Sequence, residues 1–377
     1  MNRNLLRLLV GAFFSIAPTL ALADRWLPVP TNEGHDAPSA TTLADGRILV
    51  AGGVHFTVTP NAEIFDPATD IWTSVAPMNV ARHRHASVLL PSGEVMVLGG
   101  MGANGAPTAS VEIYSPSDDT WTEIAPLSGP RSRITASVLA DGSIFVAGGT
   151  PTNDGSATGI TERLFTLAGD WMPGPTLNRP RAAHTATSLP DGRVVYVGGY
   201  LLFGSDVAEI EILSLDGTTV TLGPSMPIPR HGHLSMFDAS SNSVLVLTGF
   251  ASPGGAVGSI VSYSVTNNSW ATLGQLNSPK NGACAARLPG ERIIVAGGYG
   301  LAGGRTDTAE VFEPWSGRTW SVQDRMSVVR ASHQCVPILS RGVLVVGSAH
   351  NEDPAAEYGA DLFEGDGTAI FFDGFDP

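Results

Sequence analysis

Short apolar runs that end in glycine recur along almost the whole chain. The segment "LPDGRVVYVGGY" (189–200) has an Asp-Gly pair before a run of valines and a Gly-Gly pair after it, and similar segments occupy 43–54 and 139–150. Asp-Gly is typical of a two-residue hairpin turn, and a short apolar run between turn signals indicates a buried strand. Beyond residue 23 the sequence has no apolar repeat of 3.6 residues, so little helix is expected.

Four columns of residues repeat with a period near 50. The glycine column, defined by the second residue of each Gly-Gly pair or its equivalent, advances by 47 to 50 residues per copy. An acidic, a tryptophan and a basic column follow it, and each basic residue lies ten places after the tryptophan column. Each period carries the signals of four antiparallel strands. A period of this length indicates sheets that stack on one another, as in a propeller, rather than separate globular domains.

The two ends of the repeat region determine the number of sheets. Seven strands of the Gly-Gly type are present, but only six strands of the tryptophan column follow them. The segment "DRWLPVPT" (24–31) carries Trp26, nine residues before His35 in the basic column, and the last copy ends with "ADLFEGDG" (360–367). We therefore expect the Trp26 strand to complete the last sheet and to close seven blades into a ring.

The order of these motifs resembles the kelch repeat: Gly-Gly after an apolar strand, then a segment such as "AEIFDP", then Trp, then Arg with His three residues later. The resemblance covers about 24–365, although Val220, Thr248 and Ser348 depart from the pattern. It implies an all-β protein, a seven-bladed kelch-type β-propeller over 24–367 that is closed by an N-terminal strand. Propellers serve both as enzymes and as binding modules, so the resemblance leaves the function open.

The first 23 residues are typical of a secretory signal peptide. Arg3 and Arg7 accompany an apolar stretch, and Ala21-Leu22-Ala23 is a small-x-small cleavage pattern. We therefore expect a periplasmic or secreted protein without a membrane span, with a short tail over 368–377 outside the repeat. The whole chain has a formal net charge of −14, and it becomes more acidic without the two arginines of the signal. This surface charge disfavours nucleic acid as a partner.

The chain has two cysteines, Cys284 and Cys335, and export would permit a disulfide between them. They lie four and five residues after the basic residues of their copies. Because side chains alternate along a strand, we expect them on opposite sides of adjacent inner strands. This placement favours two small buried thiols, and a disulfide is the alternative.

The basic column and its neighbours are the candidate functional residues. The histidines come three residues after the basic column, and two tyrosines follow Gly-Gly directly. The predicted ligand-binding rim consists of Arg82, His85, Arg131, Arg181, His184, Arg230, His233, Arg330, His333, Tyr200 and Tyr299. These residues either form a cationic rim for an anionic or sugar ligand, or serve the fold. In the second case each arginine pairs with an acidic residue of a nearby blade, each histidine bonds a loop, and the tyrosines pack on neighbouring loops.

No catalytic or metal-ligating set is predicted. His83 and His231 stand in "RHRH" and "RHGH", but they belong to blades far apart around the ring, whereas zinc needs three or four converging ligands. The chain also resembles galactose oxidase-like copper proteins and sialic acid mutarotase in its repeat. The loops that follow Gly-Gly, of 10 to 13 residues, are too short for a lid. We predict a monomeric binding module for a protein or carbohydrate, without a cofactor. The alternative is a small-sugar mutarotase or copper-radical oxidase-like enzyme.

Overall fold

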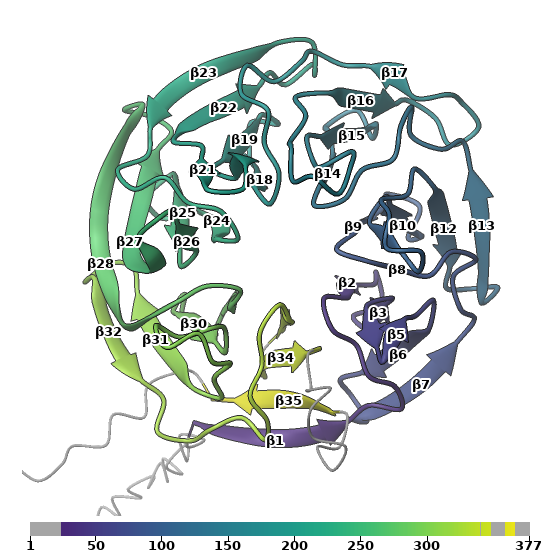
Figure 1. The fold of residues 1–377 in the computed structure, drawn as a ribbon. Coiled ribbons are helices and arrows are strands. Elements are labelled where there is room, and N and C mark those ends of the chain that lie inside the picture. The colour runs from purple at the N-terminus through teal and green to yellow at the C-terminus, as the bar shows by residue number, and fades with distance from the viewer. Residues whose placement is uncertain (1–23, 340, 348–358, 366–377) are drawn as a thin grey trace, which may run out of the picture.

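The computed structural model describes residues 24–339, 341–347 and 359–365, and these residues form an all-β ring of seven blades around a central axis (Figure 1). The predicted signal segment 1–23 and tail 368–377 lie outside the described residues. Within the described ranges, the chain has no helix of the length and hydrophobicity that a membrane crossing requires.

Each blade is an antiparallel sheet of four main strands, ordered from the axis outward. Blades 1 to 4 are β2 (Ser39–Thr42), β3 (Ile48–Ala51), β6 (Ala62–Asp66) and β7 (Ile71–Val75); β9 (Ala86–Leu89), β10 (Val95–Leu98), β12 (Val111–Ser115) and β13 (Thr120–Ile124); β14 (Thr135–Val138), β15 (Ile144–Ala147), β16 (Thr161–Leu164) and β17 (Met172–Pro173); β18 (Thr185–Ser188), β19 (Val194–Val197), β22 (Glu209–Leu213) and β23 (Val220–Ser225). Blades 5 to 7 are β24 (Leu234–Asp238), β25 (Ser243–Leu247), β27 (Gly255–Ser264) and β28 (Ser269–Lys280); β29 (Cys284–Arg287), β30 (Ile293–Ala296), β31 (Ala309–Glu313) and β32 (Arg318–Ser321); β33 (Gln334–Ile338), β34 (Gly342–Val346), β35 (Gly359–Glu364) and β1 (Arg25–Pro30).

Short strands in the loops between second and third strands form small hairpins at one face of the ring. These are β4 (Val54–His55) with β5 (Thr57–Val58), β20 (Tyr200–Leu202) with β21 (Ser205–Asp206), and β26 (Phe250–Ala251) with the start of β27. The remaining pair joins β8 (Arg82–His83) to β11 (Met101–Gly102). These loops, together with the segments that lead into each first strand, make up what we call the loop face.

The hydrophobic core is divided among the interfaces between neighbouring blades. Each second strand is buried on both faces, as in β10, because a blade packs on either side of it. One apolar cluster fills each of the seven interfaces. The tryptophan column joins the outer strands of adjacent blades: the Trp121 indole donates a hydrogen bond to the Ala76 carbonyl of the preceding blade (2.7 Å), and Trp171 donates to the Ala125 carbonyl (2.9 Å).

The Gly-Gly pairs lie where the backbones of neighbouring blades approach most closely. Gly52 and Gly53 have φ of 68° and 103°, a region that side chains disfavour. A Cβ on Gly52 would approach the carbonyl oxygen of Arg82 in the next blade to 2.5 Å. The close approach places the Gly53 N–H 2.8 Å from that same carbonyl oxygen. The repeated glycines therefore allow one blade to bond the backbone of the next.

The N-terminal strand closes the ring as the sequence predicts. β1 pairs antiparallel with β35, with Trp26 opposite Phe363, and the two lie side by side in Figure 1. Trp26 is 6% exposed and its ring centroid lies 5.0 Å from that of Phe363. Its backbone N–H donates to Asp324 (2.7 Å) in blade 6. Blade 7 thus combines the two ends of the propeller.

The expectation of two separate thiols is wrong. Cys284 and Cys335 form a disulfide between blades 6 and 7, with a Cα–Cα distance of 5.3 Å. The error arises from the geometry of stacked sheets: side chains that meet across an interface belong to opposite faces of equivalent sheets. The hydrogen bond between Thr41 and Ser87 (2.8 Å), six and five residues after their basic-column positions, follows the same rule in blades 1 and 2. One cysteine lies an even number and the other an odd number of residues after its basic-column position, and this difference brings the two together.

We expect the closing strand to stabilise the whole ring. Deletion of 24–31 exposes the outer edge of β35, and Trp26→Ala alone should cost about 3–5 kcal/mol of unfolding free energy because a large buried side chain leaves a cavity. Thermal unfolding of both variants, followed by circular dichroism, measures the effect. A deletion variant that unfolds at the wild-type temperature would contradict the closure.

Candidate functional site

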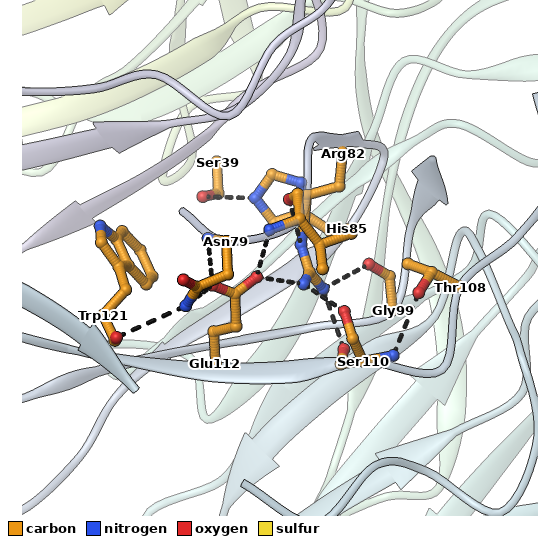
Figure 2. Close-up of polar contacts among 10 residues, drawn as sticks. Ser39, Asn79, Arg82, His85, Gly99, Thr108, Ser110, Glu112 and Trp121 are labelled. Carbon is orange, nitrogen blue, oxygen red and sulfur yellow. Dashed lines mark hydrogen bonds and ion pairs between the residues drawn. The ribbon is translucent and has the colours of Figure 1, made fainter. Parts of the chain in front are cut away.

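Arg82 in blade 2 shows what the basic column does. Its Nη2 donates to Glu112 Oε1 (2.6 Å), and its Nη1 donates to the carbonyls of Gly99 and Ser110 (both 2.9 Å; Figure 2). Glu112 Oε2 accepts the backbone N–H of Asn79 (2.6 Å). Arg82 and Glu112 are both 0% exposed. The guanidinium therefore joins the entering segment of the blade to its second and third strands.

Three further blades repeat this ion pair. Arg131 pairs with Glu162, Arg181 with Glu211 (2.8 Å) and Arg330 with Asp361 (2.8 Å). Burial lowers the pKa of each of these arginines, and the charge of the paired carboxylate opposes that shift. The partner is always on the third strand of the arginine's own blade, not on a nearby blade as the sequence suggested. The buried arginines thus hold each blade together.

Blade 5 lacks both the carboxylate of the acidic column and the backbone N–H that donates to it in blade 2. Arg230 faces Val261 in the acidic column and donates instead to the carbonyls of Thr248 (3.1 Å) and Ser259 (2.8 Å). Burial lowers the pKa of Arg230 to about 10. Pro227 occupies the position that Asn79 has in blade 2, and a proline has no N–H to offer a carboxylate. The acceptor and its backbone donor are therefore absent together.

Blade 6 keeps the acid but carries lysine in the basic column. Lys280 Nζ donates to the carbonyl and hydroxyl oxygens of Thr308 (both 3.0 Å). Burial lowers the pKa of Lys280 to about 8, and the charge of Glu310 partly opposes that shift. Glu310 accepts the backbone N–H groups of Asn277 and Ser278, as Glu112 accepts that of Asn79. The carboxylate thus orders the entering segment even without an arginine.

In blade 1 a histidine replaces the arginine. Its side chain is too short to complete the buried pair of arginine and carboxylate, which we call the clamp. His35 Nδ1 bonds the Gly52 carbonyl (2.6 Å), but its Nε2 remains 3.8 Å from Glu63 Oε2. Both carboxylate oxygens of Glu63 are buried and have no hydrogen-bond partner among the described residues. Blade 1 is therefore the blade whose buried acid is least well satisfied.

The histidines three residues after the basic column connect neighbouring blades. His85 Nε2 lies 2.8 Å from the Ser39 hydroxyl, and His184 and His233 make the same contact with threonines of the preceding blade (both 2.9 Å). His333 instead donates to the Ala296 carbonyl (3.1 Å), because Cys284 occupies the hydroxyl position. Burial is the main cause that lowers the pKa of His85, His233 and His333 to about 3, and that of His184 well below its usual value. All four are neutral in the folded protein at physiological pH.

The two tyrosines pack against their own and neighbouring loops. Tyr200 is 1% exposed, and its ring lies 4.9 Å from that of Phe203 and 5.3 Å, edge-on, from that of His231. Tyr299 is half-buried beside the Arg305 guanidinium, at 5.9 Å. Neither ring is presented openly for stacking. A ligand at the loop face would therefore meet other side chains first.

A different position of the repeat reaches the centre of the loop face. Two residues after each basic-column position the backbone has φ between 51° and 58°, and five of these residues donate their N–H to the carbonyl of the equivalent residue in the preceding blade, at 2.7 to 3.3 Å. One residue per blade thus forms a ring around the axis, which we call the inner ring. Its members are Ala37, Arg84, Arg133, Ala183, Gly232, Gly282 and Ser332. Sequence analysis missed it because its residue type is not repeated.

The inner ring carries two adjacent positive charges. Among the described residues, neither Arg84 nor Arg133 has a carboxylate within ion-pair distance, and Arg84 is exposed. Partial desolvation of the guanidinium and the charge of Arg133 lower the pKa of Arg84, and the charge of Asp36 opposes that shift. Burial, and then the charges of the two arginines, lower the pKa of His83 to about 4. The centre of the loop face is therefore cationic, although the chain as a whole is acidic.

Exposed apolar side chains lie in the loops of blades 1, 4 and 6 on the same face. Phe56 is 67% exposed, Phe203 57% and Leu301 74%. A pocket of about 220 Å³ lies at the foot of the β20–β21 hairpin, between Arg179, Leu201 and Asp206. A second pocket, of about 190 Å³, opens at the opposite face and includes Leu90, Phe165 and Leu167.

A single group of potential metal ligands converges in the described part of the chain. It consists of Cys284, His333 and Cys335, whose ligand atoms lie within 4.8 Å of one another. The two sulfur atoms are bonded to each other, so they are not thiolate ligands in this state. His231 does not join a second histidine; its Nδ1 lies 2.6 Å from Asp206.

Comparisons with known proteins agree with this architecture. The sequence profile of the Kelch motif matches residues 37–79 and 82–128. A search of curated proteins found no match. Among solved structures, the one described as "Structure of YjhT" aligns with a TM-score of 0.61 at 14% identity, over 78% of this chain and 98% of that chain. A "novel fungal alcohol oxidase with catalytic diversity among the AA5 family, in complex with copper" aligns with a TM-score of 0.73 at 16% identity, over 91% of this chain and 76% of that chain. At such identities the likeness concerns the fold alone.

The surroundings of Tyr200 do not suit a copper site like that expected for a copper-radical oxidase. Such a site would need a tyrosine that is free to bind a cation. The hydroxyl of Tyr200 is under the influence of the positive charges of Arg133 and Arg84, which oppose a metal cation there.

We expect His35→Arg to stabilise the propeller. An arginine in blade 1 has the length to reach Glu63 as Arg82 reaches Glu112, and a substitution toward the repeat consensus typically adds roughly 0.5–2 kcal/mol. Urea unfolding measures the change, and Arg82→His, the reverse substitution, serves as the control and should destabilise. A His35→Arg variant no more stable than the wild type would show that blade 1 does not need the clamp.

We expect stability to fall steeply in mild acid. The folded pKa of His85, His233 and His333 is about 3, against 6.5 for the unfolded group, so the unfolded chain binds more protons below pH 6.5. Stability is complete above pH 6.5 and is lost as the pH falls toward 3, by up to about 1.4 kcal/mol per pH unit for each histidine. Urea unfolding at pH 7 and pH 5 measures the loss. In His333→Gln this loss should be smaller, and an equal loss would assign the acid sensitivity to other groups.

Proposed function

The chain is a seven-bladed kelch β-propeller, and on this premise we propose that it is a binding module that recognises a protein or a carbohydrate through its loop face. The observation that carries the proposal is the arrangement of exposed Phe56, Phe203 and Leu301 around a cationic centre. Apolar side chains at loop tips, grouped around a polar centre, are typical of recognition surfaces.

The loop geometry also favours recognition over catalysis. The loops of blades 1, 4 and 5 are short hairpins with their own strand pairing, so their side chains are held in place before a ligand arrives. Pre-ordered loops reduce the entropy cost of binding. They also leave these blades without a long segment that could close over a substrate.

We further propose that the protein is exported to the periplasm or the medium and acts as a monomer. The proposal is supported by the signal-like residues 1–23 and by the disulfide between blades 6 and 7, because disulfides persist in oxidising compartments. β1 closes the ring within one chain, so the fold has no need of a second copy.

An enzyme is the second candidate, supported only by fold. The fungal alcohol oxidase and the YjhT structure have similar folds, so a copper-radical oxidase or a small-sugar mutarotase stays an alternative. Stoichiometric copper by elemental analysis together with alcohol oxidation would favour the oxidase. Faster interconversion of sugar anomers, observed by NMR, would favour the mutarotase.

The binding proposal is tested by screening the labelled protein on a glycan array and a peptide array. For any ligand found, Phe203→Ser combined with Leu301→Ser should weaken binding by at least about tenfold, because anchor side chains of this kind carry most of the energy of an interface. Phe165→Ser is the matched control: it removes an exposed phenylalanine from the opposite face and should leave binding unchanged. No ligand on either array, or an equal loss in the control, would contradict recognition through the loop face.

A further inference from the structure

We propose that Arg84 and Arg133 bind a carboxylate group of the ligand at the centre of the loop face. The inference rests on the proposed binding function and names the chemistry of the ligand. It follows from three features of the inner ring: the two charges lack an ion-pair partner among the described residues, a neighbouring hydroxyl lacks an acceptor, and the fold does not require either side chain.

The carboxylate whose charge acts on Arg84 already has another partner, and so has the acid of the β20–β21 hairpin. Asp36 pairs with Arg305 (3.3 Å), and Asp206 pairs with His231 (2.6 Å) and accepts the backbone N–H of Ser252 (2.6 Å). The chain has 35 acidic and 21 basic residues, so two adjacent arginines without a carboxylate are contrary to its composition. The cationic centre is therefore a local feature, and Asp36 offsets only part of the charge of Arg84.

A third polar group beside the arginines is a donor without an acceptor. Tyr200 is 1% exposed, and its hydroxyl, which lies beside the Arg133 guanidinium, has no acceptor for its own proton among the described residues. The charges of Arg133 and Arg84 act on this hydroxyl, which places it beside them. Two guanidinium groups and a hydroxyl offer mainly N–H and O–H donors to the space between them. A buried donor without a partner costs free energy, and an anionic acceptor would satisfy all three groups.

The fold does not need arginine at either position. The hydrogen bonds of the inner ring join backbone atoms, and Ala37, Ala183 and Gly232 make the same ring contacts without a charged side chain. The two guanidinium groups also repel each other, as the effect of Arg133 on the pKa of Arg84 indicates. A pair of charges that adds repulsion and forms no ion pair among the described residues has its natural role in binding.

A carboxylate suits the site better than a phosphate. The planar guanidinium matches the two oxygens of a carboxylate. The chain has a net charge of −14, which repels anions. This repulsion is greater for a doubly charged phosphate than for a singly charged carboxylate. Phe203, 5.9 Å from the Arg133 guanidinium, adds an apolar wall that fits the carbon skeleton of a sugar acid or of an acidic peptide side chain.

The test compares carboxylate probes with neutral counterparts of the same shape by isothermal titration calorimetry. One arm uses D-glucuronate and D-glucose, and the other uses acetyl-Gly-Glu-Gly amide and its Gln form, so the two sources of a carboxylate are distinguished. At least one carboxylate probe should bind the wild type, and the combined variant Arg84→Gln with Arg133→Gln should weaken it by about tenfold or more. The control Arg193→Gln removes an arginine that is paired with Asp191 in a hairpin turn of the other face, and it should have no effect.

Two further readouts separate binding from a structural role. The titration of His83, followed by NMR of its ring protons, should move to higher pH when a carboxylate probe binds and also in the combined variant, because both changes reduce the positive charge next to it. The combined variant should unfold at the same or a higher temperature than the wild type, because it loses only repulsion. A marked loss of stability would show that the arginines serve the fold.

The proposal is overturned if neither carboxylate probe binds, if the neutral probes bind as well, or if inorganic phosphate binds more tightly than both. It is also overturned if the combined variant binds like the wild type. A ligand from the arrays that needs Phe203 and Leu301 but not the two arginines would leave the binding function in place and refute the carboxylate site alone.

Discussion

The structure depends on one buried cation in each of six blades. In blade 2 the guanidinium of Arg82 bonds the end of the second strand and the start of the third strand while its own backbone lies in the segment that leads into the first strand. One side chain therefore fixes the relative positions of three of the four strands. Its backbone carbonyl in turn accepts the N–H of Gly53 from the preceding blade, so the same residue sets the spacing between neighbouring sheets.

The departures around the ring show which part of this clamp matters. Blade 7 uses Asp361, and Arg330 reaches it with Nε as well as Nη2. Blade 5 has lost both the acid and the N–H that the acid would bond, because Val261 and Pro227 occur together. The carboxylate thus serves the entering segment as much as the cation. A buried charge is tolerated when carbonyl oxygens surround it, but a buried carboxylate without donors, such as Glu63, is a weak point.

Much of the fold could be predicted from the sequence, because periodic residues have periodic roles. The spacing of Gly-Gly and Trp gives seven blades, and the unpaired Trp26 identifies the closing strand. The cysteine pairing could not be obtained from strand alternation alone, because the faces that meet belong to two different sheets. The candidate site was less predictable: a column of Arg82 and His85 has the same appearance in sequence whether its side chains point into a blade or toward solvent. Only the hydrogen bonds to Gly99 and Ser39 distinguish the two cases.

The contrast between repeated and unrepeated positions explains where function can arise in such a ring. A column that keeps its residue in most copies answers a need that most blades share, and the buried Arg and His columns do so. The inner ring is repeated in backbone conformation but not in side chain, because its contacts use N–H and C=O groups that any residue supplies. It is therefore free to vary, and in two adjacent copies it holds Arg84 and Arg133. Recognition of one particular ligand requires side chains that differ from blade to blade. The inner ring supplies such a difference, because two of its seven positions carry arginine.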